Sequence, residues 1–247
     1  MSQAMDTAFR RIGAEAGQGT FGAPATWGPT DTYKASRTYD KLIGLTILAL
    51  VSGVAGWAVV PAGIAFLALI LAFVIVLVSW FRMRWARVLA PAYAVAEGVG
   101  LGAISGIYAS QTAGIVPLAV VFTAGVFIGC LTLYRTGLVR VSPRLVSIAM
   151  VGALGLIGAS VLSLFLAVPG LSAIHGNPTL IVVFGVFGLF VGVTNLFVDF
   201  DYVQRAEAMH LPAEAEWASA LAMMTALVLV YISMLRILSV LLGGRRR

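Results

Sequence analysis

The amino-acid sequence predicts an all-α fold: a polytopic integral membrane protein whose seven transmembrane helices form one bundle. Hydrophobic residues make up 60% of the chain and charged residues only 11%, and the mean hydropathy is +1.00. Soluble domains usually carry about 25% charged residues, so a chain of this composition cannot cover its apolar surface in water. The apolar residues also gather in runs, each near the ~20 residues that a helix needs to cross a bilayer.

Seven such runs follow one another along the chain. In order they are Leu42–Val60, Ala62–Phe81, Val88–Tyr108, Ile115–Tyr134, Leu145–Val168, Thr179–Val198 and Ala218–Leu242. Each predicts a helix, because a helix satisfies its own backbone polar groups in hydrocarbon. Only Pro61 separates the first two runs, which predicts a tight turn there. Residues 42–242 therefore form the membrane domain, and no second domain is expected.

The two flanks differ in composition from the membrane domain. Residues 1–41 are polar and are interrupted by glycine and proline between Gly17 and Pro29. Such a segment buries too little apolar surface to order itself, which predicts a flexible cytoplasmic tail. No apolar run follows Met1, so no cleaved signal peptide is expected. Residues 243–247 form a short basic tail that ends in Arg245-Arg246-Arg247.

Basic residues between the spans set the expected orientation, since cytoplasmic loops are enriched in lysine and arginine. The arginines after spans two and four are Arg82, Arg84, Arg87, Arg135, Arg140 and Arg144. Loops one–two, three–four and five–six hold neither lysine nor arginine. With Arg37 and Lys41 before span one, this pattern predicts a multi-pass plasma-membrane protein whose amino terminus is cytoplasmic. Seven spans then place the last three arginines outside, against the rule, unless the last span is re-entrant.

The formal net charge of +6 does not indicate nucleic-acid binding. The arginines lie in short clusters between apolar runs, where they fix orientation and contact anionic lipid. The lipid bilayer is therefore an expected partner. Cys130 is the only cysteine, which excludes an internal disulfide.

Glycines recur inside three spans at helical spacing. They are Gly98, Gly102 and Gly106, then Gly152, Gly155 and Gly158, then Gly185, Gly188 and Gly192. In lipid, small residues let helix backbones approach closely. These glycines therefore predict packing faces.

The end of span six carries the pattern most typical of a functional site. Gly188, Gly192, Asn195 and Asp199 are spaced by four, three and four residues, so on a helix they share one face. Asp199 continues that face where the span reaches the cytoplasmic surface, and it is the candidate site residue. Asp201 points away from the face and is expected to be solvated.

Two further charges lie inside spans. Glu97 is near the middle of span three, where a carboxylate costs about 2.5 kcal/mol or more on insertion scales. It should therefore face the bundle interior, either as a hydrogen-bonded or protonated helix contact or in a functional role. Arg236, in the last third of span seven, either reaches the headgroups as an anchor or forms an ion pair.

The residues that several chemistries require are missing from the spans. Both histidines, His175 and His210, lie in loops, so neither can act as a base or metal ligand at depth. A span serine such as Ser160 therefore has no histidine base. No lysine follows Lys41, which excludes a Schiff-base lysine and a phosphate-binding Gly-Lys-Ser/Thr motif. We expect no enzyme activity, no cofactor and no metal centre.

Four stretches together resemble the Bax inhibitor-1 family. They are Leu196-Phe-Val-Asp199-Phe-Asp201-Tyr-Val, Tyr231-Ile-Ser-Met-Leu235-Arg236-Ile237-Leu238, Pro91…Glu97-Gly98…Leu101-Gly102…Ser105…Tyr108 and Arg37-Thr38-Tyr39-Asp40. The last two are similar to those of its bacterial, actinobacterial-type branch, and the resemblance runs from about Arg37 to the end of span seven. It implies a seven-helix bundle with a central helix and a pH-sensitive cation pathway through which calcium can leak. A pair of aspartates, at the ends of spans six and seven, would close that pathway.

The resemblance places the span-six aspartate of this pair on Asp199. The span-seven aspartate falls near Thr225 or Ala226, and neither is acidic, so the chain lacks half of the pair. Two carboxylates that share a proton titrate as a coupled pair, and Asp199 alone loses this coupling unless another acid replaces its partner. The candidate replacements are Asp201, Glu97 and the segment Glu214-Ala-Glu216.

Two hypotheses of different class follow. The first is a passive or proton-gated pathway for cations, calcium or protons, with Asp199 as the titratable gate and Glu97 as a polar step at mid-membrane. Asn195, Asp201 and Arg236 complete its expected residues. The alternative is a non-transporting regulatory protein that acts through helix-face contacts with a membrane protease or a stress-response partner. The mid-span glutamate favours the first hypothesis, and the missing span-seven acid favours the second.

Overall fold

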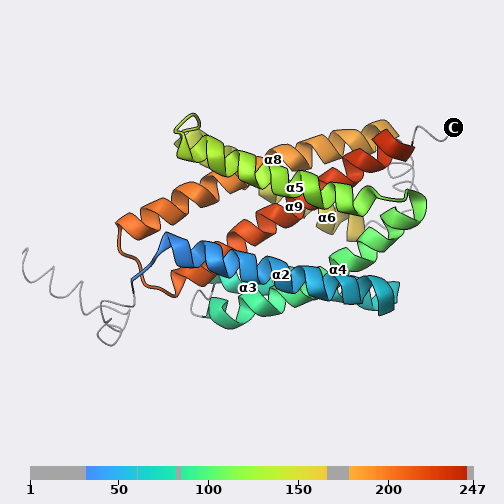
Figure 1. Cartoon of the computed structure of the whole chain (residues 1–247), viewed down its shortest axis with the longest axis horizontal. Helices are drawn as coiled ribbons and strands as arrows, with labels where there is room; N and C mark the ends of the chain where they lie inside the picture. Colours follow the sequence, from blue (N-terminus) through green and yellow to red (C-terminus); the bar gives the residue numbers. More distant parts are fainter. Residues whose placement is uncertain (1–31, 60, 82–84, 166–177, 244–247) are drawn as a thin grey trace, which may run out of the picture. The chain divides into compact units, whose positions relative to one another are not determined.

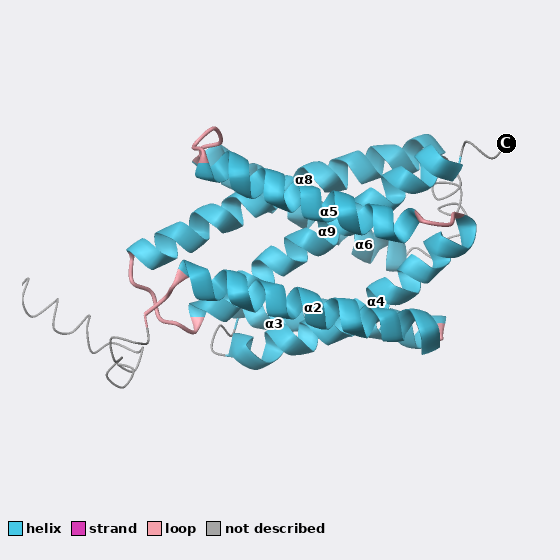
Figure 2. Ribbon diagram, viewed as in Figure 1, coloured by secondary structure: helices cyan, strands magenta, loops and turns pink. Residues whose placement is uncertain are grey.

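The computed structural model describes residues 32–59, 61–81, 85–165 and 178–243, and its seven helices there confirm the predicted all-α fold (Figure 1, Figure 2). The helices are α2 (Ala35–Val59), α3 (Ala62–Phe81), α4 (Ala86–Gln111), α5 (Ile115–Arg135), α6 (Pro143–Phe165), α8 (Pro178–Ala208) and α9 (Ala215–Gly243). The chain divides into two units, Met1–Thr32 and Tyr33–Arg247, and these helices all belong to the second.

Five of the helices (α2, α4, α5, α8 and α9) are long and apolar enough to cross a membrane. Helices α3 and α6 add the shorter apolar stretches Gly63–Ser79 and Pro143–Gly155 among the residues described. Large apolar side chains on the outer faces are open, such as Val54, which is 71% exposed. Such surfaces suit hydrocarbon and not water. The chain is therefore an integral, multi-pass membrane protein.

Two helices extend beyond the apolar runs that predict them. Helix α2 begins at Ala35, so the expected tail boundary at Lys41 falls inside a helix, and residues 35–41 are not a flexible tail. Helix α8 continues past Val198 to Ala208. Both extensions are polar, and a search for apolar runs cannot detect them. Residues 1–31 and the basic residues 244–247 lie outside the described part of the chain.

The connection at Pro61 agrees with the predicted tight turn. Helix α2 ends at Val59 and α3 begins at Ala62. The Pro61 carbonyl accepts hydrogen bonds from the amides of Ile64 and Ala65 at 3.0 and 3.1 Å. This carbonyl therefore caps the first turn of α3.

Helices α2 and α4 pack closely and run in the same direction. A methyl group added at Gly98 would meet Ala49 and the Ser52 hydroxyl, and one added at Gly102 would meet the Gly53 carbonyl. The contact thus advances along both helices together. Helix α4 also packs on α3, α5 and α9, and half of its membrane-spanning stretch is buried. These two glycines form a packing face, as predicted.

The glycines of α8 face α9, and those two helices run antiparallel. A methyl group at Gly185 would lie 2.9 Å from Ile237, and one at Gly192 would lie 2.8 Å from Val230. The glycines of α6 are mixed: Gly152 packs on α8, whereas Gly155 has nothing within 4 Å of an added methyl group. The predicted packing role is therefore wrong for Gly155.

Helix α9 is continuous over its 29 residues, Ala215–Gly243. At about 1.5 Å per residue it is roughly 44 Å long, more than the ~30 Å hydrocarbon core. It packs against α2, α4, α5 and α8, as expected for a central helix. A re-entrant last span is therefore excluded. It cannot explain why the loop charges predict that the last three arginines lie outside the cell.

Candidate functional site

The two glycines of the stripe on α8 face α9. Gly188 lies against the Ser233 hydroxyl, and Gly192 lies against Val230 and the Ala226 carbonyl. Asn195 and Asp199 continue the same face by their spacing. The stripe is therefore first a helix-packing seam, with its polar end toward the start of α9.

The two polar members of the stripe differ in how their side chains are used. The Asn195 amide donates a hydrogen bond to the Val191 carbonyl of its own helix at 3.0 Å. Asp199 is partly buried. It makes no hydrogen bond or ion pair with any other residue that the structure describes. Asp199 is thus the member of the stripe that is available for protonation or for a cation.

The position that the resemblance gives to a second aspartate lies on the α9 side of this seam. An added methyl group on Gly192 would come 3.5 Å from the Ala226 carbonyl oxygen, and Ala226 is buried. The neighbouring Thr225 hydroxyl donates to the Ala222 carbonyl at 2.7 Å. The seam therefore holds a methyl group and a locally bonded hydroxyl where a second carboxyl would be needed.

Asp201 is engaged, although the sequence predicts a solvated side chain. Its carboxylate pairs with the Arg205 guanidinium at 2.7 Å, one helical turn further along α8, and the Asp201 side chain is 21% exposed. The Tyr134 hydroxyl of α5 also donates to it, at 3.4 Å. Asp201 thus ties α8 to the end of α5.

Glu97 lies on the helix with the most buried span and is itself only 8% exposed. This confirms the prediction that it faces the interior of the bundle. Its carboxyl has no hydrogen bond or ion pair with the residues described. Glu97 and Asp199 lie on helices that both pack on α9. A groove of about 450 Å³ lies between α2, α4, α5 and α9, and neither Glu97 nor Asp199 lines it.

Arg236 lies on α9 beside the other end of the glycine stripe. Its Cβ would be 3.4 Å from a methyl group at Gly185, and the residue is partly buried. It forms no ion pair with a described residue. An anchoring role fits this position, and the structure does not bring Arg236 to Asp199.

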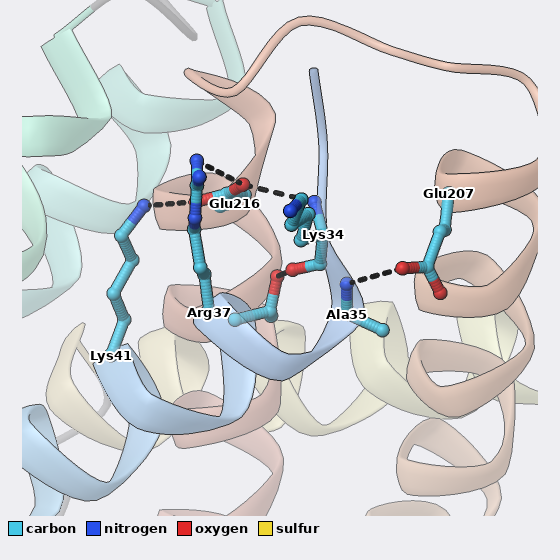
Figure 3. Close-up of polar contacts among 7 residues, drawn as sticks. Lys34, Ala35, Arg37, Lys41, Glu207 and Glu216 are labelled. Carbon is cyan, nitrogen blue, oxygen red and sulfur yellow. Dashed lines mark hydrogen bonds and ion pairs between the residues drawn. The ribbon is translucent and has the colours of Figure 1, made fainter. Parts of the chain in front are cut away.

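A cluster of charges lies where α2, α8 and α9 meet (Figure 3). Sequence reasoning names several of its members separately but does not bring them together. The centre of the cluster is Glu216, in the first turn of α9, which is fully buried. The Glu216 carboxylate accepts from the Lys34 backbone amide at 3.0 Å and from the Lys41 ammonium at 2.5 Å. The Arg37 guanidinium is 3.9 Å away. We call these four residues the Glu216 cluster.

Neighbouring contacts complete the attachment of α2 at this end. Glu207, near the end of α8, accepts from the Ala35 amide at 3.3 Å, and the Tyr33 amide donates to the Leu211 carbonyl at 2.8 Å. The Lys41 ammonium also lies 4.9 Å from the centre of the Trp217 ring. The first amides of α2, which have no partner within their own helix, are thus capped by carboxylates from α8 and α9.

A sequence signal for this cluster exists. Lys34, Arg37 and Lys41 are spaced by three and four residues, so they share a helix face. Glu216 lies just before the predicted span Ala218–Leu242, where an acid suits the helix dipole. The signal is only local, since Lys41 and Glu216 are 175 residues apart in the chain.

The fold and these residues define a polytopic helical membrane protein in which Glu97 and Asp199 have no partner among the described residues and a buried ionic cluster lies at one end. The chain belongs to the Bax inhibitor 1 like family, whose family model matches residues 13–243, nearly the whole chain. No curated protein matched. Membership of the bacterial branch stays a prediction.

Proposed function

We propose that this protein provides a pH-sensitive pathway for the passive movement of cations, calcium or protons, across the plasma membrane. Asp199 acts as the titratable gate and Glu97 as a polar step within the bundle. We also propose that the end of α2 that carries the Glu216 cluster faces the cytoplasm. The family membership and the positions of the two carboxyl groups support this proposal.

The observation that carries it is Glu97. A carboxyl group within a membrane span is costly, and such groups by default mark ion or proton pathways. Most buried acids are paired, yet Glu97 is 8% exposed and has no partner among the described residues. No hydrogen bond or ion pair among the described residues therefore explains why the Glu97 carboxyl group is buried. Asp199, also without a partner in the described part of the chain, supplies a second titratable group.

The test is ion flux in liposomes that contain the purified full-length protein. Calcium entry and proton movement are recorded with trapped dyes at acidic and at alkaline pH. We expect Glu97→Gln and Asp199→Asn to weaken both the flux and its pH dependence, because an amide cannot titrate. Asp40→Asn, at an exposed position of α2, is the control and should leave flux unchanged. Wild-type flux equal to that of empty liposomes would contradict the proposal.

The alternative is a non-transporting regulatory protein that binds a membrane protease or a stress-response partner through its helix faces. It is favoured by Ala226, because the seam lacks the second acid that the resemblance requires for the gate. It predicts no flux above empty liposomes and a membrane protein that copurifies after mild solubilisation. Substitutions on exposed helix faces, and not Glu97→Gln, would then abolish that copurification.

A further inference from the structure

A partly polar pocket of about 440 Å³ lies between the beginning of α2 and the ends of α5 and α8, which Figure 1 shows at the same end of the bundle. Its lining is Ala35, Tyr39, Arg135, Gln204, Glu207 and Ala208. This size is usual for small-molecule sites, which span about 300–1,000 Å³. Ala35 and Arg135 are also end residues of two candidate membrane spans. The pocket therefore lies at the level of the lipid headgroups, where the apolar helices reach water.

Two opposite charges line this pocket. Arg135 ends α5 and forms no ion pair with any residue that the structure describes. Glu207, near the end of α8, uses one carboxylate oxygen to accept from the Ala35 amide at 3.3 Å, and in Figure 3 its other oxygen points away from that amide. The Tyr39 side chain lies within electrostatic reach of both charges. A guanidinium and one carboxylate oxygen are therefore both available to a ligand.

The chemistry of these side chains fits a ligand that carries both signs of charge. An arginine guanidinium binds phosphate oxygens in a bidentate way, and the Gln204 amide and the Tyr39 hydroxyl are further donors. The positive end of the α2 dipole also favours an anion here. A purely anionic ligand would be repelled by Glu207. That carboxylate instead accepts hydrogen bonds from a primary ammonium group, whereas a quaternary ammonium group has no N–H to donate.

We propose that this pocket binds the phosphate and the primary ammonium group of one molecule, the headgroup of a phosphatidylethanolamine-type lipid. The phosphate lies against Arg135 and Gln204, and the ammonium group lies against Glu207. A lipid is favoured over a dissolved zwitterion because membrane lipids present this group at the level of the pocket. Glu97 and Asp199 do not line the pocket, so the inference does not rest on ion flux.

The experiment measures which lipid the full-length protein binds. Purified protein is titrated with phosphatidylethanolamine and with phosphatidylcholine of identical acyl chains, and native mass spectrometry counts each bound lipid. Arg135→Gln removes the guanidinium, and Glu207→Gln removes the negative charge but keeps an oxygen that can accept from the α2 amide. Arg140→Gln and Glu214→Gln are the matched controls, because they remove the same charges outside the pocket lining.

We expect the wild-type protein and both controls to bind one phosphatidylethanolamine about tenfold more tightly than phosphatidylcholine, as one hydrogen bond to a charged group would give. Glu207→Gln should remove this preference. Arg135→Gln should weaken the binding of both lipids, because both carry the phosphate. Each variant should still protect the buried thiol of Cys130, which shows that it is folded.

Two results would overturn the proposal. One is equal binding of the two lipids by the wild-type protein, and the other is the same loss in Arg140→Gln as in Arg135→Gln. Dissolved glycerophosphoethanolamine, which carries the same headgroup without acyl chains, should displace the lipid only at a far higher concentration. Displacement at an equal concentration would overturn the choice of a lipid and assign the pocket to a dissolved ligand of the same chemistry.

Discussion

The sharpest stability prediction concerns Glu216. Its carboxylate binds the Lys34 amide, the Lys41 ammonium and the Arg37 guanidinium, and so joins the first turns of α2 to the first turn of α9. Replacing it with alanine leaves Lys41, whose side chain is 21% exposed, without its partner. We expect Glu216→Ala to lower the thermal stability of the folded protein while leaving its seven helices in place.

The size of the effect follows from the burial of each partner. Removing one member of a buried ion pair costs about 3–5 kcal/mol, but Lys41 can extend toward water, which reduces the cost. Arg37, 41% exposed, is taken to contribute nothing, as is common for exposed pairs. We therefore expect Glu216→Ala to lose about 2–3 kcal/mol of unfolding free energy. Glu216→Gln keeps an acceptor for the Lys34 amide, so its loss should be about 1–2 kcal/mol.

The assay uses the single thiol of Cys130, which is buried in the folded protein. A maleimide dye that fluoresces on reaction reports its exposure as the protein is heated in nanodiscs. A loss of this size corresponds to a Tm lower by about 4–12 °C, at about 2–4 °C per kcal/mol for chains of this length. Glu214→Ala is the matched control, because Glu214 is two residues away and its side chain has no partner among the described residues. Equal Tm values for Glu216→Ala and Glu214→Ala would refute the reasoning.

Three further predictions follow from other parts of the structure. Gly102→Ala places a methyl group against the Gly53 carbonyl and should lower the unfolding free energy by about 1–3 kcal/mol through overpacking. Gly106→Ala, whose added methyl group has its nearest contact at 3.7 Å, is the control and should leave the Tm within a degree or two. Equal Tm values for the two variants would show that α2 and α4 can separate freely. Tyr33→Phe removes a buried hydroxyl without a hydrogen-bond partner in the described part of the chain, so the Tm at neutral pH should stay or rise. Burial raises the pKa of Tyr33, so Tyr33 deprotonates in the unfolded chain before it does in the folded protein, and stability should fall as pH rises past about 10. Tyr33→Phe should lessen that fall. A pH profile of the Tm that is the same in the variant and the wild type would contradict this prediction. A cysteine at the exposed Ser36, in a cysteine-free background, should react with an impermeant maleimide in inverted vesicles and not in intact cells; labelling of intact cells would reverse the proposed orientation.

The number and order of the helices follow from the sequence because the bilayer sets both length and polarity. The run Ala62–Phe81 predicts α3 residue for residue, and Ile115–Tyr134 predicts α5 to within one residue. The start of α2 and the end of α8 do not follow, because their polar residues are stabilised by partners far away in the chain. Lys34 and Glu216, for example, are separated by 182 residues. No local pattern of hydropathy reports such a pairing.

The candidate site was predictable in part, for the same reason. Helical spacing places Gly188, Gly192, Asn195 and Asp199 on one face, and the cost of a carboxyl group in hydrocarbon places Glu97 inside the bundle. Which acids are paired depends on the packing of different helices. Asp201 illustrates this, because Arg205 is visible one turn away in the sequence but the Tyr134 contact comes from α5. The groove that α2, α4, α5 and α9 line is a gap between four helices, and a sequence carries no periodic signal for a gap.

The acids fall into two groups, and this division sharpens the proposed mechanism. Glu216 is held in an ion pair that joins α9 to α2, and Asp201 pairs with Arg205 within α8 and accepts a hydrogen bond from Tyr134 of α5, so protonating either would weaken a contact between helices. Glu97 and Asp199 have no partner among the described residues, so each can gain or lose a proton without breaking a contact between helices. A pH-sensitive pathway that must stay folded while it switches needs acids of the second kind. If the proposal is right, Asp199→Asn changes flux and not Tm, whereas Glu216→Ala changes Tm; if Asp199→Asn instead lowers the Tm as much as Glu216→Ala does, Asp199 is a structural acid and the gate must lie elsewhere.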